Sequence, residues 1–479
     1  MTEEEAARAA GLPDLPPLAV AEIDLDGPDG EVLSLRPAPG GPPLGEGGVY
    51  ALVRLRGHPA ATVLAHVRAG EDPAEVLAEA FRAEWAVRKR HHAQGRSAEH
   101  RARAQPVPPP SAERPTPPLP RATVVVATRE RAGQLARALD SLLAQDHPDF
   151  QVLVVDNAPV TTATRDLVQG RYAGRVDYVL EPVPGLATAH NRGVAAARGE
   201  VLAFTDDDVV ADPHWLTALA EPFAADPRLG CVTGLILPAR LTTPAQILLE
   251  SHGGFAKGFT PRLYDPAAPP ADEPLFPFTA GSFGSGANMA FRAQVLASVG
   301  GFDPATGTGT PARGGDDLYA FVRVLSAGHR LRYTPEALVW HHHRETWQDL
   351  RNQAYGYGAG LTAYLTAILV RRPALLPSLL RKLPRGLAHA RAITAHRDGP
   401  AGGAVPGAGP AGRATPGGAS AGSARDGAGA PGAFGVPGVH GAQSHPWPRS
   451  LSRLERRGML HGPLGYLKAR LRQRGSSRP

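Results

Sequence analysis

The chain has 479 residues, which is longer than one ordinary domain, so one large domain with additional segments is expected. Its 51 Lys and Arg against 45 Asp and Glu leave a formal net charge of only +6, which does not indicate nucleic acid as a partner. The single cysteine, Cys231, excludes an internal disulfide and a Cys-based zinc site and favours a reducing, cytoplasmic compartment.

Residues 18–97 are expected to form a small α+β domain behind a flexible N-terminus, 1–17. The segments AVAEIDLDG and VYALVRLRG alternate like strands, and DPAEVLAEAFRAEWAVRKRH has helical periodicity. No motif in this region carries chemistry, so its role stays open. A Pro- and Arg-rich segment, 98–120, then predicts an extended linker.

From residue 121 to 360 short apolar runs alternate with helical segments. ATVVVAT, QVLVVD, VDYVLE and VLAFTDDD are each followed by a segment with helical character. Such runs predict an α/β domain with a mainly parallel sheet covered on both faces. Ligands of such sheets bind beyond the carboxyl ends of the strands, so chemistry is expected there.

The C-terminal part is expected to contain helices at 361–396, a disordered Gly/Ala/Pro-rich segment at 397–446 and a basic amphipathic tail at 447–479. The apolar run LTAYLTAILV is too short to span a membrane, which takes roughly 20 residues. The tail interleaves leucines with basic residues. Two alternatives stay open for it: a solvated tail, or peripheral contact with the anionic inner face of a membrane.

Three adjacent carboxylates, Asp206, Asp207 and Asp208, follow the strand VLAF directly. They repel one another unless a cation or hydrogen-bond donors are present. In an extended segment Asp206 and Asp208 project to the same side, where they can hold Mg²⁺ or Mn²⁺ together with phosphate oxygens. The alternative is a solvated acidic turn before the next helix.

A second acidic pair, Asp316 and Asp317, opens a predicted amphipathic helix about 110 residues later. A carboxylate there can accept a proton from an incoming hydroxyl, provided that it does not bind the metal. Ordinary capping of the helix is the alternative.

Histidines 341, 342 and 343 end the predicted strand LRYTPEALVW. Neutral imidazole can complete a metal site, and strand alternation sends His341 and His343 to one side. Either of these two can be the ligand.

The ends of the first two strands carry polar residues suited to a base and ribose: Thr128, Arg129, Glu130 and Arg131 end the first, and Asp156 and Asn157 end the second. No GxGxxG or GxxxxGK[ST] motif occurs, so neither a dinucleotide fold nor a P-loop is supported. The charge of a diphosphate would then be met by a metal.

Five segments, in this order, resemble the family 2 glycosyltransferases of the GT-A fold: VVVATRER, LVVDNAP, GLATAHNRGVAAARGEVLAFTDDDVVADPHWL, GSGANMAFRAQVLASVGGFD and GGDDLYAFVRVLSAG. The resemblance covers roughly 121–360. It implies an inverting transfer of a sugar from a nucleotide-diphosphate donor to an acceptor hydroxyl, with Mn²⁺ or Mg²⁺ as cofactor. The acceptor class stays open, with a lipid-linked or cell-envelope compound among the alternatives.

The resemblance also implies roles for individual residues. Nucleotide-donor contacts fall on Thr128, Glu130, Asp156, Asn191 and Asp206; the DxD metal ligands on Asp206 and Asp208; the base on Asp317 beside Asp316; and the donor-sugar loop on Gly286, Ala287 and Asn288. This chain departs from the family at His190, where an Arg is common, and at Tyr319, where a second acid is common. A metal-dependent nucleotidyltransferase or phosphohydrolase is the alternative function.

Overall fold

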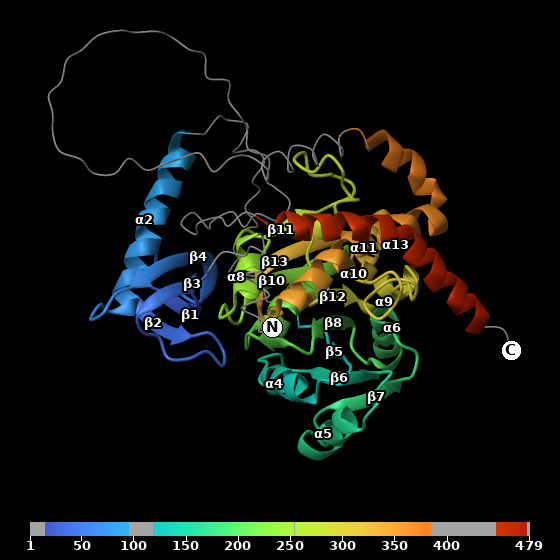
Figure 1. The fold of residues 1–479 in the computed structure, drawn as a ribbon, viewed down its shortest axis with the longest axis horizontal. Helices are drawn as coiled ribbons and strands as arrows, with labels where there is room; N and C mark the ends of the chain where they lie inside the picture. The colour runs from blue at the N-terminus through green and yellow to red at the C-terminus, as the bar shows by residue number, and fades with distance from the viewer. Residues whose placement is uncertain (1–14, 95–117, 253, 383, 385–446, 477–479) are drawn as a thin grey trace, which may run out of the picture.

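The computed structural model describes residues 15–94, 118–252, 254–382, 384 and 447–476 (Figure 1). Most of the expected flexible N-terminus and of the 98–120 linker, the end of the 361–396 helical segment and the expected disordered segment 397–446 therefore lie outside the described residues.

The N-terminal region forms a four-stranded sheet with one helix. The strands are β1 (Leu18–Leu25), β2 (Val32–Pro37), β3 (Gly47–Leu55) and β4 (His58–Val67), and the helix is α2 (Pro73–Gln94). Their order is β2-β1-β3-β4, with β1 and β3 parallel and the outer pairs antiparallel.

Both faces of this small sheet contribute side chains to hydrophobic cores. One face packs beneath α2 through side chains such as Ile23, Val53 and Phe81. The other carries Tyr50 and Leu52 into a hydrophobic core shared with the large domain. The small sheet is therefore packed between its own helix and the rest of the protein.

The large domain is built on a nine-stranded sheet with the order β11-β13-β10-β12-β8-β5-β6-β7, and β9 pairs with β13. Its strands are β5 (Ala122–Thr128), β6 (Phe150–Asn157), β7 (Asp177–Glu181), β8 (Val201–Asp206), β9 (Val209–Ala211), β10 (Leu229–Pro238), β11 (Arg262–Tyr264), β12 (Asn288–Arg292) and β13 (Arg330–His341). Strands β8, β5, β6 and β7 are parallel, as are β10 and β13, whereas β12 runs antiparallel between β8 and β10. The predicted α/β sheet, mainly parallel and flanked by helices, is confirmed.

Helices cover both faces of this sheet (Figure 1). They are α4 (Ala132–Leu142), α5 (Ala163–Arg171), α6 (Leu186–Ala196), α7 (Trp215–Ala225), α8 (Pro244–Ser251), α9 (Ala293–Ser298), α10 (Asp316–Ser326) and α11 (Trp347–Arg371). Successive residues of the central strands enter opposite cores: Val125 packs in the core that contains α10, and Val124 in the core that contains α4 and α7. Burial on both faces explains why these strands are continuously apolar.

The C-terminal helix α13 (Arg449–Ser476) packs along α11. Glycines make this approach possible: a Cβ atom at Gly358 would lie 1.9 Å from the carbonyl oxygen of Glu455, and one at Gly458 would lie 2.1 Å from that of Tyr355. Within the described residues, no single helix meets the length and apolarity of a membrane span, and α11 does so only together with Pro373–Lys382 across a bend of 106°.

Candidate active site

The acidic triplet lies where β8 ends and β9 begins. β9 pairs antiparallel with the end of β13, so that Val209 lies opposite His341, and the backbone N–H of His342 donates to the carbonyl of Asp208 at 2.9 Å. This pairing brings one histidine beside two aspartates. The ligand atoms of Asp206, Asp208 and His341 all lie within 4.8 Å of one another, close enough to hold one metal ion.

Asp208 is buried, and two arginines and a histidine surround it. Its Oδ2 lies 3.3 Å from Nη1 of Arg131 and 3.6 Å from Nη2 of Arg344, and its Oδ1 lies 3.3 Å from Nε2 of His341. Burial raises the pKa of Asp208, but the neighbouring histidine and the two arginines outweigh burial and hold the pKa below its usual value. Burial also lowers the pKa of His341 to about 4, so that its imidazole is neutral at physiological pH.

Asp206 has the opposite electrostatic setting. Burial raises its pKa well above the usual value, and the negative charges of Asp208, Asp207 and Asp316 raise it further. Asp208 Oδ1, for its part, has no hydrogen-bond donor within the described chain. The carboxylates of Asp206 and Asp208 and the neutral imidazole of His341 form a donor set suited to a hard divalent cation.

Asp207 points away from this group and has structural partners. Its carboxylate accepts a hydrogen bond from the hydroxyl of Thr128 at 2.6 Å and one from Nη1 of Arg131 at 3.0 Å. Thr128, a predicted nucleotide contact, therefore uses its hydroxyl to tie the end of β5 to the triplet.

The second acidic pair begins helix α10. The preceding Gly315 has φ +85°, and a Cβ there would lie 2.5 Å from the carbonyl oxygen of Gly360 on α11, so only glycine fits this turn. Asp316 is buried, and its Oδ2 lies 3.5 Å from Nδ1 of His190.

Asp317 accepts a hydrogen bond from the backbone N–H of Gly286 at 2.9 Å. Burial, followed by the charge of Asp316, raises the pKa of Asp317 to about 6. A carboxylate with that pKa is ionised at neutral pH and is still able to accept a proton.

Short backbone contacts connect the two acidic clusters. Gly286 bonds to Asp317, and the next residue, Ala287, accepts a hydrogen bond from the hydroxyl of Thr205 at 2.8 Å, immediately before Asp206. The charge of Asp316, at the start of α10, raises the pKa of Asp206, at the end of β8, which agrees with these contacts. The strand-end and helix-start carboxylates thus meet at one edge of the sheet.

Other predicted site residues have their side chains engaged elsewhere. The amide of Asn288 is buried and bonds to Trp215, Leu235 and Ala337, so only the backbone of the neighbouring 286–287 segment faces the acidic clusters. Asn191 pairs with both the N–H and the carbonyl of Phe302 at 2.8 Å.

The two predicted nucleotide acids also have local partners. Glu130 accepts hydrogen bonds from the N–H groups of Val160 and Thr161 and from the Thr161 hydroxyl. These bonds, that from the Thr161 N–H above all, lower the pKa of Glu130. Asp156 is buried at the end of β6, where it accepts from the Tyr178 hydroxyl at 2.9 Å, and burial raises its pKa.

Of the two predicted histidine ligands, only His341 belongs to the three-residue group that could hold a metal among the described residues. His343 contacts Glu250 through Nε2 and His341 through Nδ1, both at 3.1 Å, so it lies outside the three-residue group.

Arg344 and Lys257 were not among the predicted site residues, whereas Arg131 lies in the 128–131 segment that was predicted to suit a nucleotide. Arg344 directly follows the strand-end histidines, and this position is the signal that it offered. Lys257 lies in the segment after α8; burial lowers its pKa to about 8, and the charge of Asp317 opposes that shift.

Residues 123–297 match the family model described as Glycosyl transferase family 2. Pre-mycofactocin glycosyltransferase of Mycobacterium tuberculosis is 28% identical over 274 residues, covering 55% of this chain and 53% of the relative. Validoxylamine A glucosyltransferase of Streptomyces hygroscopicus is 37% identical over 126 residues, covering 24% of this chain and 29% of the relative. The chain spans about half the length of the first of these relatives. Among solved structures, a mannosyltransferase from Pyrobaculum calidifontis in complex with GDP-Man and Mn²⁺ has a TM-score of 0.41 at 20% identity, covering 66% of this chain and 85% of that one.

Proposed function

Because residues 123–297 belong to glycosyl transferase family 2, we propose that this glycosyltransferase moves a sugar from a nucleotide-diphosphate donor to an acceptor hydroxyl with inversion. Asp206, Asp208 and His341 would hold a divalent cation, Mn²⁺ or Mg²⁺, which supplies positive charge opposite a diphosphate.

The proposed chemistry assigns the proton transfer to Asp317. Its carboxylate takes the proton of the acceptor hydroxyl as that oxygen bonds to the anomeric carbon, while the bond from that carbon to the diphosphate oxygen breaks. Arg131 and Arg344 keep Asp208 ionised, and Lys257 adds positive charge near Asp317. The observation that carries the proposal is the link Asp317–Gly286–Ala287–Thr205, which joins the base to the metal-binding cluster.

A two-step experiment tests this function. A panel of nucleotide sugars is screened by thermal shift with Mn²⁺, because a ligand that binds only the folded state raises its apparent stability. The stabilising donor is then incubated with candidate acceptors, and release of nucleoside diphosphate that needs both acceptor and metal is expected. Release of pyrophosphate or of a sugar phosphate would instead identify nucleotidyl transfer or phosphohydrolysis.

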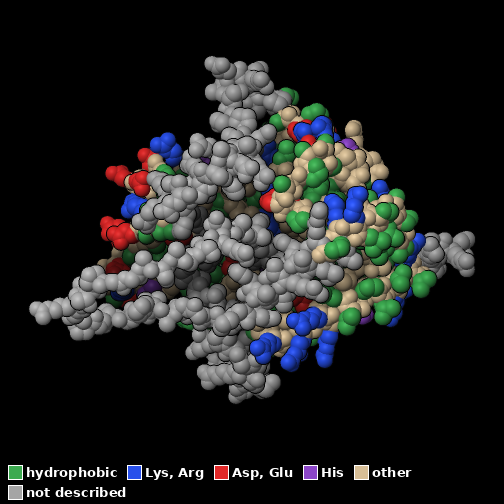
Figure 2. Space-filling model, turned by 90° about the horizontal axis from the view of Figure 1, so that it is seen from above, with side chains coloured by type: hydrophobic (Ala, Val, Ile, Leu, Met, Phe, Trp, Pro, Cys, Tyr) green, Lys and Arg blue, Asp and Glu red, His purple; other side chains and the backbone are tan. Residues whose placement is uncertain are grey.

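We also propose that the exposed face of α13 rests on an anionic membrane surface and so brings the enzyme to a lipid-borne acceptor. Four leucines at helical spacing are exposed there: Leu460 (78%), Leu464 (68%), Leu467 (42%) and Leu471 (67%). Exposed Arg453, Arg456, Arg457 and Lys468 lie on the same side of the helix. Seen from above, hydrophobic side chains and groups of Lys and Arg lie together over this end of the molecule (Figure 2).

Charge favours a lipid surface over a second copy of the chain as the occupant of this face. Two α13 helices packed on each other would bring basic residues opposite basic residues, whereas anionic headgroups neutralise them and the leucines enter the acyl boundary. The inner side of α13 contacts the segment that precedes α10, because Nε2 of His461 is 3.2 Å from the carbonyl oxygen of Pro311, six residues before Asp317.

Sedimentation of the full chain with vesicles tests the membrane contact. Binding is expected to vesicles of 30% phosphatidylserine in phosphatidylcholine, and the double variant Leu464→Gln/Leu471→Gln should lose most of it. Leu33→Gln, which changes a leucine exposed on the N-terminal sheet, is the matched control and should bind like wild type. Equal sedimentation of all three proteins, or a leucine-dependent dimer in light scattering, would overturn this contact.

A further inference from the structure

A buried chain of polar side chains runs from the N-terminal sheet to the candidate metal site. The hydroxyl of Tyr50, on β3, donates to Oε1 of Glu250, on α8, at 3.2 Å. Glu250 Oε2 lies 3.1 Å from Nε2 of His343, and His343 Nδ1 lies 3.1 Å from Nδ1 of His341. All four residues are buried, with between 2% and 7% of each exposed. The ring of Phe255 packs against both imidazoles.

The chemistry of these groups gives the chain a direction. A carboxylate only accepts hydrogen bonds, so the proton between Glu250 and His343 belongs to His343 Nε2. Only one proton can lie between the two Nδ1 atoms. When His343 carries its single ring proton on Nε2, it accepts at Nδ1, and His341 donates from its own Nδ1. This assignment follows from the hydrogen-bond network and leaves the lone pair of His341 on Nε2.

The opposite side of His341 agrees with this direction. Nε2 of His341 lies 3.3 Å from Asp208 Oδ1, yet that oxygen receives no hydrogen bond from any described residue. Two acceptors that face each other at such a distance repel unless a cation lies between them. The geometry of His341 is therefore that of a metal ligand whose tautomer is fixed by His343, which contacts its Nδ1.

We propose that Tyr50 and Glu250 are positioning residues for the metal site. Through His343 they hold His341 in the tautomer and orientation that present Nε2 to a cation shared with Asp206 and Asp208. This inference rests on the proposed function. Carboxylate partners behind metal-bound histidines recur in metalloproteins and tune the affinity for the ion. The small N-terminal domain, which carries no motif of its own, thereby becomes part of the active-site framework.

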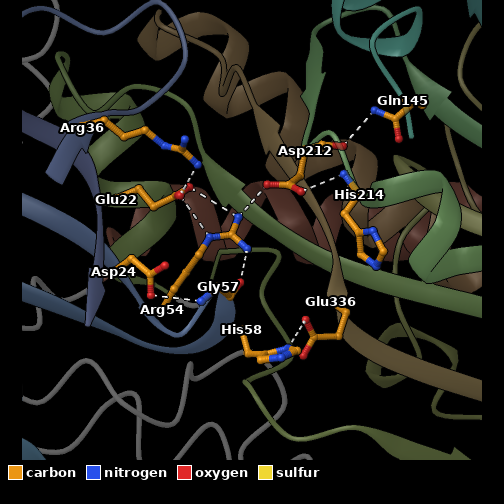
Figure 3. A network of polar contacts seen from close by, with 10 residues as sticks. All are labelled: Glu22, Asp24, Arg36, Arg54, Gly57, His58, Gln145, Asp212, His214 and Glu336. Atoms are coloured by element: carbon orange, nitrogen blue, oxygen red, sulfur yellow. Dashed lines mark hydrogen bonds and ion pairs between the residues drawn. The ribbon is translucent and has the colours of Figure 1, made fainter. Parts of the chain in front are cut away.

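A second contact docks the same domain without involving His341 or His343 (Figure 3). Buried Arg54, on β3, contacts Asp212 at 2.6 Å and Glu22 at 3.1 Å. Asp212 in turn accepts from the N–H of His214, and its carbonyl accepts from Gln145. Arg54 contacts neither His341 nor His343. A substitution of Arg54 therefore loosens the packing of the N-terminal domain and leaves the Tyr50–Glu250–His343–His341 chain in place.

The test measures Mn²⁺ affinity of the full chain, without donor, by electron paramagnetic resonance. Tyr50→Phe removes one hydroxyl and keeps the ring in the core, and Glu250→Gln removes the charge behind His343. Both are expected to weaken Mn²⁺ about 10-fold or more, as outer-shell changes typically do, and to alter the visible spectrum of bound Co²⁺. Tyr264→Phe, which removes a buried hydroxyl bonded to Ser282, and Arg54→Met should keep wild-type affinity and spectrum.

Each outcome has a distinct meaning. Unchanged Mn²⁺ affinity and Co²⁺ spectrum in folded Tyr50→Phe and Glu250→Gln would overturn the positioning role. An equal loss in Arg54→Met would overturn it too, because domain docking rather than the hydrogen-bonded chain would then control the ion. If the variants weaken Mn²⁺ but the wild type transfers no sugar with any donor, the positioning role stands and the proposed function fails.

Discussion

The three aspartates at the end of β8 and the two that begin α10 are the same residue type at the same edge of one sheet, yet their surroundings differ. His341, Arg344 and Arg131 approach Asp208 and together outweigh burial, so that its pKa is lowered. Asp317 has a backbone N–H and a second carboxylate as neighbours, and its pKa rises to about 6. Under the proposed function, this difference suits Asp208 to the role of a charged ligand and Asp317 to that of a proton acceptor.

The largest effect that separates the two clusters is expected from Asp317→Asn. The amide keeps the shape of the side chain and cannot take the acceptor proton, so kcat should fall by about 10²–10⁴. If Asp317 is the base and not a metal ligand, the affinities for Mn²⁺ and for the donor, measured by calorimetry, should stay within about twofold of wild type. Turnover at the wild-type rate would remove Asp317 from the reaction.

Asp208→Ala should give the complementary result. It removes a ligand oxygen and leaves Arg131 and Arg344 without their shared carboxylate, so Mn²⁺ should bind more weakly by at least the ~10–100-fold typical of outer-shell changes. Calorimetry with Mn²⁺ measures this loss, and saturating metal should restore part of the activity. Normal affinity in this variant would contradict the ligand role.

The pH dependence of transfer tests the base alone. A base with a pKa of about 6 is ionised above that value and protonated below it. The rate constant kcat should therefore be level near pH 7–8 and fall about tenfold per pH unit below about pH 6. Rates from pH 5 to 8 under saturating metal and donor measure this limb, and a profile that stays flat down to pH 5 would contradict the assignment.

The smallest effect is expected at Asp207, the member of the triplet that bonds to structural partners. Thr128→Val removes one hydrogen bond to a buried carboxylate and should cost about 1–3 kcal/mol of folding free energy. Thermal unfolding should show a lower Tm, while Mn²⁺ affinity should match that of wild type. If metal affinity falls with this change, Asp207 takes part in binding the ion after all.

Much of the large domain could be predicted because its signals are local. Continuous apolar runs predicted strands buried on both faces of the sheet. Aspartates at the ends of such runs were therefore expected at the carboxyl edge of the sheet. The antiparallel insertion of β12 between β8 and β10 was not foreseen, since a short apolar run does not encode its direction.

Residue types and strand ends, written in the sequence itself, determined that this protein would gather carboxylates and histidines at one sheet edge. Only the tertiary structure decided which of them meet. In the folded chain His341 lies beside Asp206 and Asp208, and His343 contacts the far side of the His341 ring. The Asn288 side chain is buried in the core. Tyr50 contacts Glu250, which lies 200 residues away in the sequence. Periodicity reports which face of an element is buried, whereas the partner across that face depends on how distant elements pack.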